Sequence, residues 1–226
     1  MEEHVILVDE FDNELGTMPK LEAHQKNELH RAFSIFIWNS KNEMLLQKRA
    51  SSKYHSPNLW TNACCSHPRK NETTIEAAHR RLKEEIGITT NLNHSFQFIY
   101  QVAFDNQLFE HELDHVFIGK YDKTPELNLE EVSEFRWAKI DDIQKEIKEN
   151  PSTFTFWFKY ILEHSHKSAF TNLNLLMIYL VRLRQLGVKV ADVAPLDTIN
   201  TLKEENVALK YKLDEILSEL RKTIIV

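Results

Sequence analysis

Short apolar runs separated by polar turn residues fill much of the chain before residue 140. The runs are rich in β-branched and aromatic side chains, which fit the half-buried surface of a sheet. We therefore expect strands at residues 4–9, 32–39, 44–48, 95–104, 108–119 and 135–137. Turn residues at 13–16 follow the first strand. Those at 39–42 join the next two strands into a hairpin.

A helical period replaces this pattern in residues 73–86. Apolar side chains on one helix face recur at Ile75, Ala78, Leu82 and Ile86. Thr73 and Glu76 have the spacing of a capping box, and Gly87 suits the C-terminal cap. Further helices are expected at 141–149 and 153–164. Strands and helices in this order predict an α/β fold, an α/β/α sandwich around a mixed sheet.

The last part of the chain has a different pattern. Residues 173–186 predict an apolar helix, and a heptad repeat begins at Ile199 with a single polar a position, Asn206. We therefore expect two parts, an α/β domain at 1–167 and an all-α, partly coiled-coil extension at 168–226. The heptads predict a parallel homodimer or pairing with another helix. The alternative is an antiparallel helical hairpin packed on the α/β domain.

Composition narrows the class of protein. The chain has 226 residues and a formal net charge of -6, which argues against a nucleic-acid-binding surface. Its longest apolar run, residues 175–181, is too short to cross a bilayer. The first residues lack a basic region followed by an apolar one, so we expect no secretory signal and a cytoplasmic location. The two adjacent cysteines predict free thiols in a reducing compartment.

Candidate chemistry gathers before residue 168, where all eleven histidines and both cysteines lie. The candidate metal ligands are His24, His30, His67, Glu110 and Glu112. The two glutamates alternate on a predicted strand, so their carboxylates face one side. Three imidazoles and two carboxylates suit a borderline divalent ion. Spacing alone leaves open that these are surface histidines and strand-face glutamates.

Cys65 has four interpretations, which are a nucleophile, an acid/base group, a metal ligand and an inert buried thiol. Its nearby histidine and arginines favour an active role, because such surroundings can lower a thiol pKa. Cys64 faces the other way in an extended segment and is expected in the core. A set of basic residues would bind a diphosphate if it converged: Lys20, Arg49, Lys53 and Arg81.

Residues 66–88 resemble a Nudix box, whose pattern is G-x5-E-x7-R-E-U-x-E-E-x-G-U. The matching positions are Glu72, Arg80, Leu82, Glu84, Glu85, Gly87 and Ile88. Ser66 replaces the glycine, and Arg81 replaces a glutamate that binds metal in Nudix hydrolases. An arginine there would repel the ion that a hydrolase needs.

This departure is typical of type I isopentenyl-diphosphate isomerases. The segment Thr61-Asn62-Ala63-Cys64-Cys65-Ser66-His67-Pro68 resembles their cysteine motif, and Glu110-His111-Glu112 resembles their Glu-x-Glu. Arg49-Ala50-Ser51-Ser52-Lys53 and the paired histidine segments near His24 and His30 resemble them too. The similarity covers about residues 3–163, with the motifs in the family's order.

The resemblance implies a role for each matched residue. The divalent metal, by resemblance Zn²⁺, Mn²⁺ or Mg²⁺, would be bound by His24, His30, His67, Glu110 and Glu112. Glu85 would hold a second ion, Mg²⁺, that grips the diphosphate, together with the clamp of Lys20, Arg49, Lys53 and Arg81. Cys65 and Glu112 would be the acid/base pair, with Tyr100 supporting Glu112. Trp157 would lie over the hydrocarbon end, although a core aromatic is its plain interpretation.

The implied reaction moves a double bond between isopentenyl and dimethylallyl diphosphate through a tertiary carbocation, in isoprenoid biosynthesis. A strong acid is required because an alkene is a poor base. Two alternatives remain, a Nudix diphosphate hydrolase and a non-catalytic Nudix-fold interaction protein. Arg81 and Cys65 argue against the hydrolase, and the intact set of acid/base and metal positions argues against the non-catalytic protein.

Overall fold

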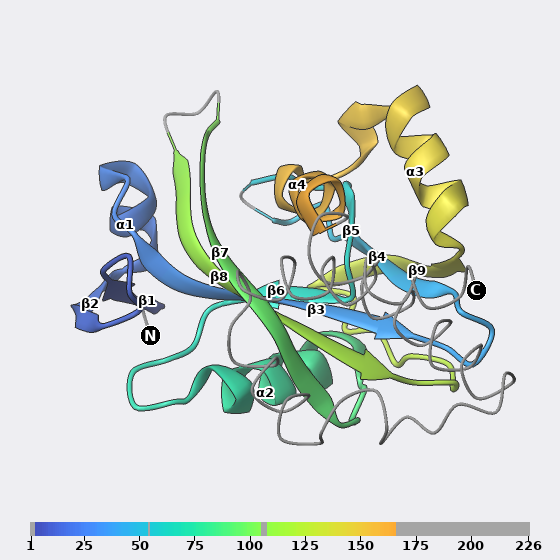
Figure 1. Cartoon of the computed structure of the whole chain (residues 1–226), viewed down its shortest axis with the longest axis horizontal. Helices are drawn as coiled ribbons and strands as arrows, with labels where there is room; N and C mark the ends of the chain where they lie inside the picture. The colour runs from blue at the N-terminus through green and yellow to red at the C-terminus, as the bar shows by residue number, and fades with distance from the viewer. Residues whose placement is uncertain (1–2, 54, 105–107, 166–226) are drawn as a thin grey trace, which may run out of the picture. The chain divides into compact units, whose positions relative to one another are not determined.

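In the part of the chain that the structure describes, nine strands form one mixed sheet with helices on both of its faces (Figure 1). The computed structural model describes residues 3–53, 55–104 and 108–165. The strands are β1 (His4–Val8), β2 (Glu14–Pro19), β3 (His30–Trp38), β4 (Met44–Arg49), β5 (Trp60–Thr61), β6 (Cys64–Ser66), β7 (Leu92–Ala103), β8 (Phe109–Lys120) and β9 (Val132–Ala138). The helices are α1 (Lys20–Lys26), α2 (Thr74–Ile86), α3 (Ile140–Glu149), a short 3₁₀ turn η1 (Pro151–Thr153) and α4 (Phe156–Ser165). The α/β prediction is confirmed.

β3 is the centre of the sheet and pairs with four other strands. It runs parallel to β8, so that His30 lies beside Glu112. It is antiparallel to β6, so that Ser34 lies beside Cys65. Both registers bring chemistry-bearing side chains from distant parts of the sequence to one region of the sheet.

The core lies between the sheet and α2. Phe33, Ile35 and Ile37 of β3 are fully buried against Leu82 and Ile86 of the helix. α2 begins with the predicted capping box, in which Thr73 and Glu76 bond to each other's backbone N–H. It ends at Gly87, which adopts the left-handed conformation with φ 67°. The two caps and the apolar face together determine where α2 begins and ends. This helix carries the arginines and glutamates of the segment that resembles a Nudix box.

Three local predictions differ from the structure. The first turn spans residues 9–13, not 13–16, because the Asp9 carboxylate accepts hydrogen bonds from the backbone N–H of Phe11 and Asn13, both at 2.9 Å. The hairpin at 39–42 forms, but its strands share only the pair Trp38–Met44, and β4 pairs mainly with β9. Residues 153–155 precede α4 because Thr155 N donates to Trp60 O at 3.0 Å.

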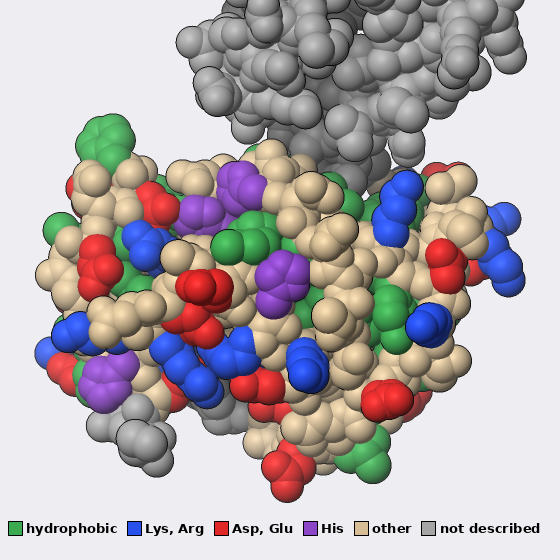
Figure 2. Space-filling model, turned by 90° about the horizontal axis from the view of Figure 1, so that it is seen from below, with side chains coloured by type: hydrophobic (Ala, Val, Ile, Leu, Met, Phe, Trp, Pro, Cys, Tyr) green, Lys and Arg blue, Asp and Glu red, His purple; other side chains and the backbone are tan. Residues whose placement is uncertain are grey.

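Other expectations lie outside the described residues. These are the apolar helix at 173–186, the heptads from 199, the extension at 168–226 and its pairing. No described helix has the length and apolar character needed to span a membrane. On the face shown in Figure 2, Lys and Arg side chains lie next to Asp and Glu side chains.

Candidate active site

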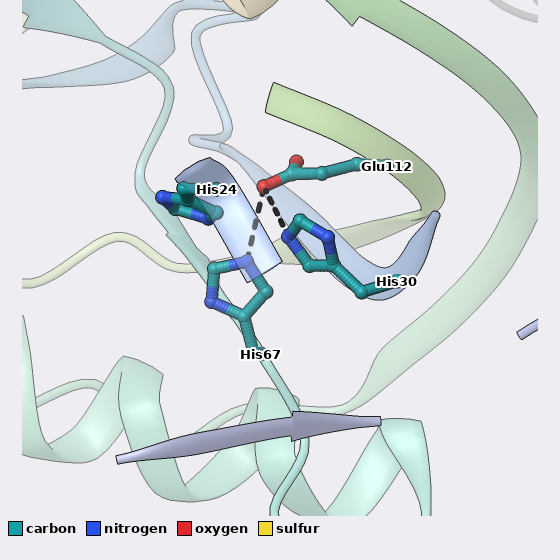
Figure 3. A group of neighbouring side chains, drawn as sticks. All are labelled: His24, His30, His67 and Glu112. Atoms are coloured by element: carbon teal, nitrogen blue, oxygen red, sulfur yellow. Dashed lines mark hydrogen bonds and ion pairs between the residues drawn. The ribbon is translucent and has the colours of Figure 1, made fainter. Parts of the chain in front are cut away.

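Four side chains from four separate segments meet in one group, His24, His30, His67 and Glu112 (Figure 3). One ligand atom from each lies within 4.8 Å of the others. His24 comes from α1 and His30 from the start of β3, while His67 follows β6 and Glu112 lies on β8. All four are buried. The spacing of these residues along the sequence did not predict that they converge. The pairing of β3 with β6 and β8 brings three of them together, and α1 adds His24.

The electrostatics of this group suit a divalent cation. Burial, together with His67 and His30, lowers the pKa of His24 to about 2. Burial and the charge of Lys20 lower the pKa of His67 to about 4. Burial opposes ionisation of Glu112, but the neighbouring His30 and a hydrogen bond from His67 hold its pKa well below the usual range. Neutral imidazoles and an ionised carboxylate are the donors that such a metal needs.

One buried atom also points to a missing partner. Within the described part of the chain, His67 Nδ1 is buried and makes no hydrogen bond, while His67 Nε2 lies 3.0 Å from Glu112 Oε1. His30 Nε2 lies 3.6 Å from the same carboxylate oxygen. Imidazole nitrogens crowded around one carboxylate oxygen fit a bound cation better than a purely structural cluster.

Glu110, the fifth predicted ligand, lies beside this group but not in it. Glu110 and Glu112 face the same side of β8, as the alternation predicts, and Tyr100 joins them. The Tyr100 hydroxyl lies 3.0 Å from Glu110 Oε2 and 2.7 Å from Glu112 Oε2. Burial and the neighbouring Glu112 raise the pKa of Glu110 well above its usual range. The ligand role of Glu110 therefore stays a prediction.

The Cys65 thiol is held by hydrogen bonds from three directions. Its Sγ accepts from Trp157 Nε1 at 3.1 Å, donates to Asn62 Oδ1 at 3.0 Å and lies 3.5 Å from Ser34 Oγ. Both hydrogens of the Asn62 amide are used on the backbone oxygens of Ile35 and Cys64, so its oxygen must face the thiol.

The expected lowering of the thiol pKa at Cys65 is wrong. Burial and the carboxyl group of Asp114 raise this pKa to about 12, which outweighs the lowering by the hydrogen bonds with Ser34 and Asn62. Such a pKa favours the protonated thiol at neutral pH. Cys64 is fully buried in the core, as its position in the extended segment predicted.

One pocket of about 400 Å³ unites most of the predicted site. All four predicted cations line it together with the predicted catalytic groups: Lys20, Arg49, Lys53, Arg81, Cys65, Tyr100, Glu112 and Trp157. Arg49 lies over the Trp157 ring, 5.3 Å from its centre, and donates to the carbonyls of His55 and Ser56. The indole thus lies between the basic end of the pocket and Cys65.

Glu85, the predicted ligand of the second ion, lies behind the pocket wall. Its carboxylate accepts hydrogen bonds from Arg81 Nη2 at 2.7 Å and from Gln47 Nε2 at 3.1 Å. Arg81 and Glu85 share one helix face, as their spacing predicts. Because Arg81 neutralises Glu85, this end of the site differs from a Nudix box that holds its metal with carboxylates alone.

Three pocket-region residues were not predicted from the sequence. Asp114 is buried and accepts a hydrogen bond from Ser34 Oγ at 2.8 Å. The sequence could have predicted Asp114, because this residue continues the alternation of Glu110 and Glu112 along the strand. His55 lies 3.6 Å from Glu110 Oε1, and Glu131 binds two of the pocket cations. Neither residue belongs to a periodic sequence pattern, because both lie in loops.

The chain was compared with known proteins. A NUDIX domain matches residues 28–158. Isopentenyl-diphosphate Delta-isomerase 2 of Aromatoleum aromaticum is 46% identical over 163 residues, which cover 72% of this chain and 86% of that protein. Isopentenyl-diphosphate Delta-isomerase 2 of Photorhabdus laumondii is 49% identical over 162 residues, covering 72% and 92%. The crystal structure of DR0079 from Deinococcus radiodurans matches with a TM-score of 0.59 at 19% identity, over 70% of this chain and 97% of that one.

The level of similarity decides what each match contributes. The DR0079 match supports the fold alone, because its sequence identity is low. The two isomerase relatives match at 46% and 49% identity over most of both chains. The chain therefore belongs to the isopentenyl-diphosphate Delta-isomerase family of NUDIX-domain proteins.

Proposed function

We propose that this protein interconverts isopentenyl diphosphate and dimethylallyl diphosphate in isoprenoid biosynthesis. One observation carries the proposal. A single pocket is lined by a thiol, by a tyrosine-bridged carboxylate pair and by four cations. The reaction needs two proton-transfer groups, and its substrate is an alkene attached to a diphosphate. The pocket provides groups for proton transfer and cations for the diphosphate within one cavity.

The diphosphate would bind at the basic end, through Lys20, Arg49, Lys53 and Arg81. Arginine presents planar N–H pairs that match phosphate oxygens, whereas lysine supplies a compact charge. Glu85, behind Arg81, would hold the Mg²⁺ that accompanies the diphosphate. At the other group, His24, His30, His67, Glu110 and Glu112 would hold Mn²⁺, Mg²⁺ or Zn²⁺. When bound, that ion supplies positive charge that makes the neighbouring acid stronger.

Cys65 and Glu112 would act as the two acid/base groups. One adds a proton to a carbon of the double bond and leaves a tertiary carbocation, and the other removes a proton from the adjacent carbon to form the new double bond. Tyr100 would orient and stabilise Glu112 through its hydroxyl, 2.7 Å from the carboxylate. Because Cys65 and Glu112 come from β6 and β8, the sheet register sets the distance between them.

Trp157 would protect the carbocation. An indole face stabilises a cation by about 0.5–2 kcal/mol, and the ring is only 3% exposed. Water would quench such an intermediate, so a buried aromatic wall serves two purposes. The plain interpretation of Trp157 as a core aromatic does not account for its hydrogen bond to Cys65.

The alternatives are weaker. A Nudix hydrolase would need the box carboxylate that Arg81 replaces, and Arg81 is engaged with Glu85 at 2.7 Å. A non-catalytic interaction protein would not need a buried thiol, tyrosine and carboxylate pair in one pocket. A small-molecule diphosphate is therefore the partner we propose. The cytoplasmic location and the homodimer remain predictions, and sedimentation of a chain truncated before Ile199 tests the dimer.

Proton NMR of isopentenyl diphosphate with Mg²⁺ in D₂O tests the proposal, with the wild type beside Cys65→Ala. Deuterated dimethylallyl diphosphate from the wild type and none from the variant is the expected result. Phosphate or pyrophosphate release from other diphosphates, without isomerisation, would replace the proposal with the hydrolase. No turnover of either kind would favour the non-catalytic protein.

A further inference from the structure

Glu131 joins two of the pocket's cations that come from distant parts of the chain. Its Oε1 accepts a hydrogen bond from Arg81 Nη2 at 3.1 Å, and its Oε2 forms an ion pair with Lys53 Nζ. The residue lines the pocket, and its side chain is about one-fifth exposed. The roles proposed above for metal binding and proton transfer do not use it.

The backbone fixes the position of Glu131 independently of these ion pairs. Its carbonyl accepts from Ala50 N at 3.0 Å, and its own N–H donates to Asn128 O at 2.9 Å. Asn128 N in turn donates to Glu85 O at 2.9 Å, at the end of α2. Glu131 is therefore tied to the segments that carry Lys53 and Arg81. The carboxylate serves as a fixed point between two long side chains. Lys53 would otherwise be mobile, whereas Arg81 is also held by Glu84 and Glu85.

The hydrogen-bond inventory shows that Glu131 need not leave when an anion binds. An ammonium group has three donors, and Glu131 uses one donor of Lys53. Arg81 has five, and its two terminal nitrogens bond to Glu84, Glu85 and Glu131. Lys53 therefore keeps donors for phosphate oxygens while it stays paired with Glu131. Burial opposes ionisation of Glu131, but Lys53 and Arg81 lower its pKa below the usual value, so the bridge is charged.

We propose that Glu131 is a positioning residue for the diphosphate, holding Lys53 and Arg81 together and remaining between them while they bind phosphate oxygens. This inference rests on the proposed function and adds a residue to its diphosphate site. The alternative is that Glu131 acts as a counter-anion, which the diphosphate displaces when it binds. The two roles predict opposite effects of neutralising Glu131. Loss of a positioning residue weakens anion binding, whereas loss of a competitor strengthens it.

The test compares Glu131→Gln and Glu131→Asp with the wild type. Glu134→Gln is the matched control, because Glu134 also pairs with a lysine, Lys48 at 2.8 Å, but its side chain is 55% exposed. Calorimetry measures binding of inorganic pyrophosphate in the presence of Mg²⁺, and NMR measures kcat and KM for isopentenyl diphosphate. We expect Glu131→Gln to raise both the Kd and KM about tenfold, with kcat within about twofold, as for loss of one charge-assisted contact.

Each outcome decides for or against the inference. Glu131→Asp keeps the charge and should restore part of the affinity, and Glu134→Gln should match the wild type. Unchanged or tighter pyrophosphate binding by Glu131→Gln would overturn the inference, as would a loss confined to kcat. If Glu131→Gln has a lowered Tm, Glu131→Asp decides, because its shorter side chain keeps the charge but cannot span both cations. Pyrophosphate binding weaker than that of the wild type supports the inference, and binding as tight or tighter overturns it. A wild type that binds pyrophosphate but does not isomerise would refute the proposed function and leave this inference standing.

Discussion

The group of His24, His30, His67 and Glu112 should make the folded protein more stable when a divalent cation is added. Its four ligand atoms lie within 4.8 Å of one another only because α1, β3, β6 and β8 are assembled. An unfolded chain does not hold this arrangement. The cation therefore binds the native state preferentially and raises the free energy of unfolding.

The size of the effect follows from mass action. At a cation concentration one hundred times the Kd, the gain is about 2.7 kcal/mol. A domain of this size gains about 2–4 °C in Tm per kcal/mol, so the expected increase is about 5–11 °C. His67→Asn removes one of the four ligands. A hundredfold loss of affinity would reduce the gain to about 0.4 kcal/mol, or about 1–2 °C.

The assay is thermal unfolding of protein treated with EDTA, before and after addition of Mn²⁺ or Zn²⁺. His79→Asn is the control, because His79 lies on α2 outside the group and should leave the increase unchanged. The reasoning is refuted if the wild type shows no increase, or if His67→Asn shows the same increase as the wild type.

Three further predictions concern catalysis, backbone strain and pH. Trp157→Phe keeps an aromatic face but removes the N–H donor 3.1 Å from Cys65 Sγ, so kcat should fall up to about tenfold with a smaller change in KM, measured by the NMR assay. Gly87→Ala should lower the free energy of unfolding in urea by more than about 1 kcal/mol, because φ is 67° and the new Cβ would lie 2.7 Å from the Cβ of Glu126. Burial lowers the pKa of His115 to about 4, so the unfolded chain takes up this proton first as the pH falls below 6.5. His115 should then contribute a decrease in the free energy of unfolding of about 1.4 kcal/mol per pH unit down to about pH 4, and His115→Gln should reduce the overall slope by that amount.

Controls separate these effects from general damage. Trp60→Phe replaces an indole that stacks on Lys48 and Arg136, and it should leave kcat unchanged. A wild-type kcat in Trp157→Phe would show that the hydrogen bond to Cys65 is not used. Equal stability of Gly87→Ala and the wild type would mean that the turn after α2 relaxes freely. An unaltered pH slope in His115→Gln would assign that slope to other groups.

The sequence by itself determined most of the local structure. Residues 73–86 carry a capping box, an apolar stripe and a glycine cap, which all favour the same helix, and α2 has these ends. The main strands follow from β-branched and aromatic runs within a few residues. The paired parity of Glu110 and Glu112 predicted carboxylates on one side of a strand, and Tyr100 contacts both. These features depend on neighbours within a turn or a strand, so a sequence pattern can encode them.

Features that depend on contacts between distant segments were decided by the tertiary structure. His24, His30, His67 and Glu112 are spread over 89 residue numbers. The β3–β6 and β3–β8 registers bring the last three together, and the packing of α1 adds His24. The pKa of Cys65 is raised, against the expectation from its sequence neighbours, because desolvation depends on burial in the folded protein. The ion pairs of Glu131 are also decided by the tertiary structure, because its two cations come from a loop and a helix that meet only after folding. Sequence patterns report periodicity along the chain, whereas convergence and desolvation arise from packing across it.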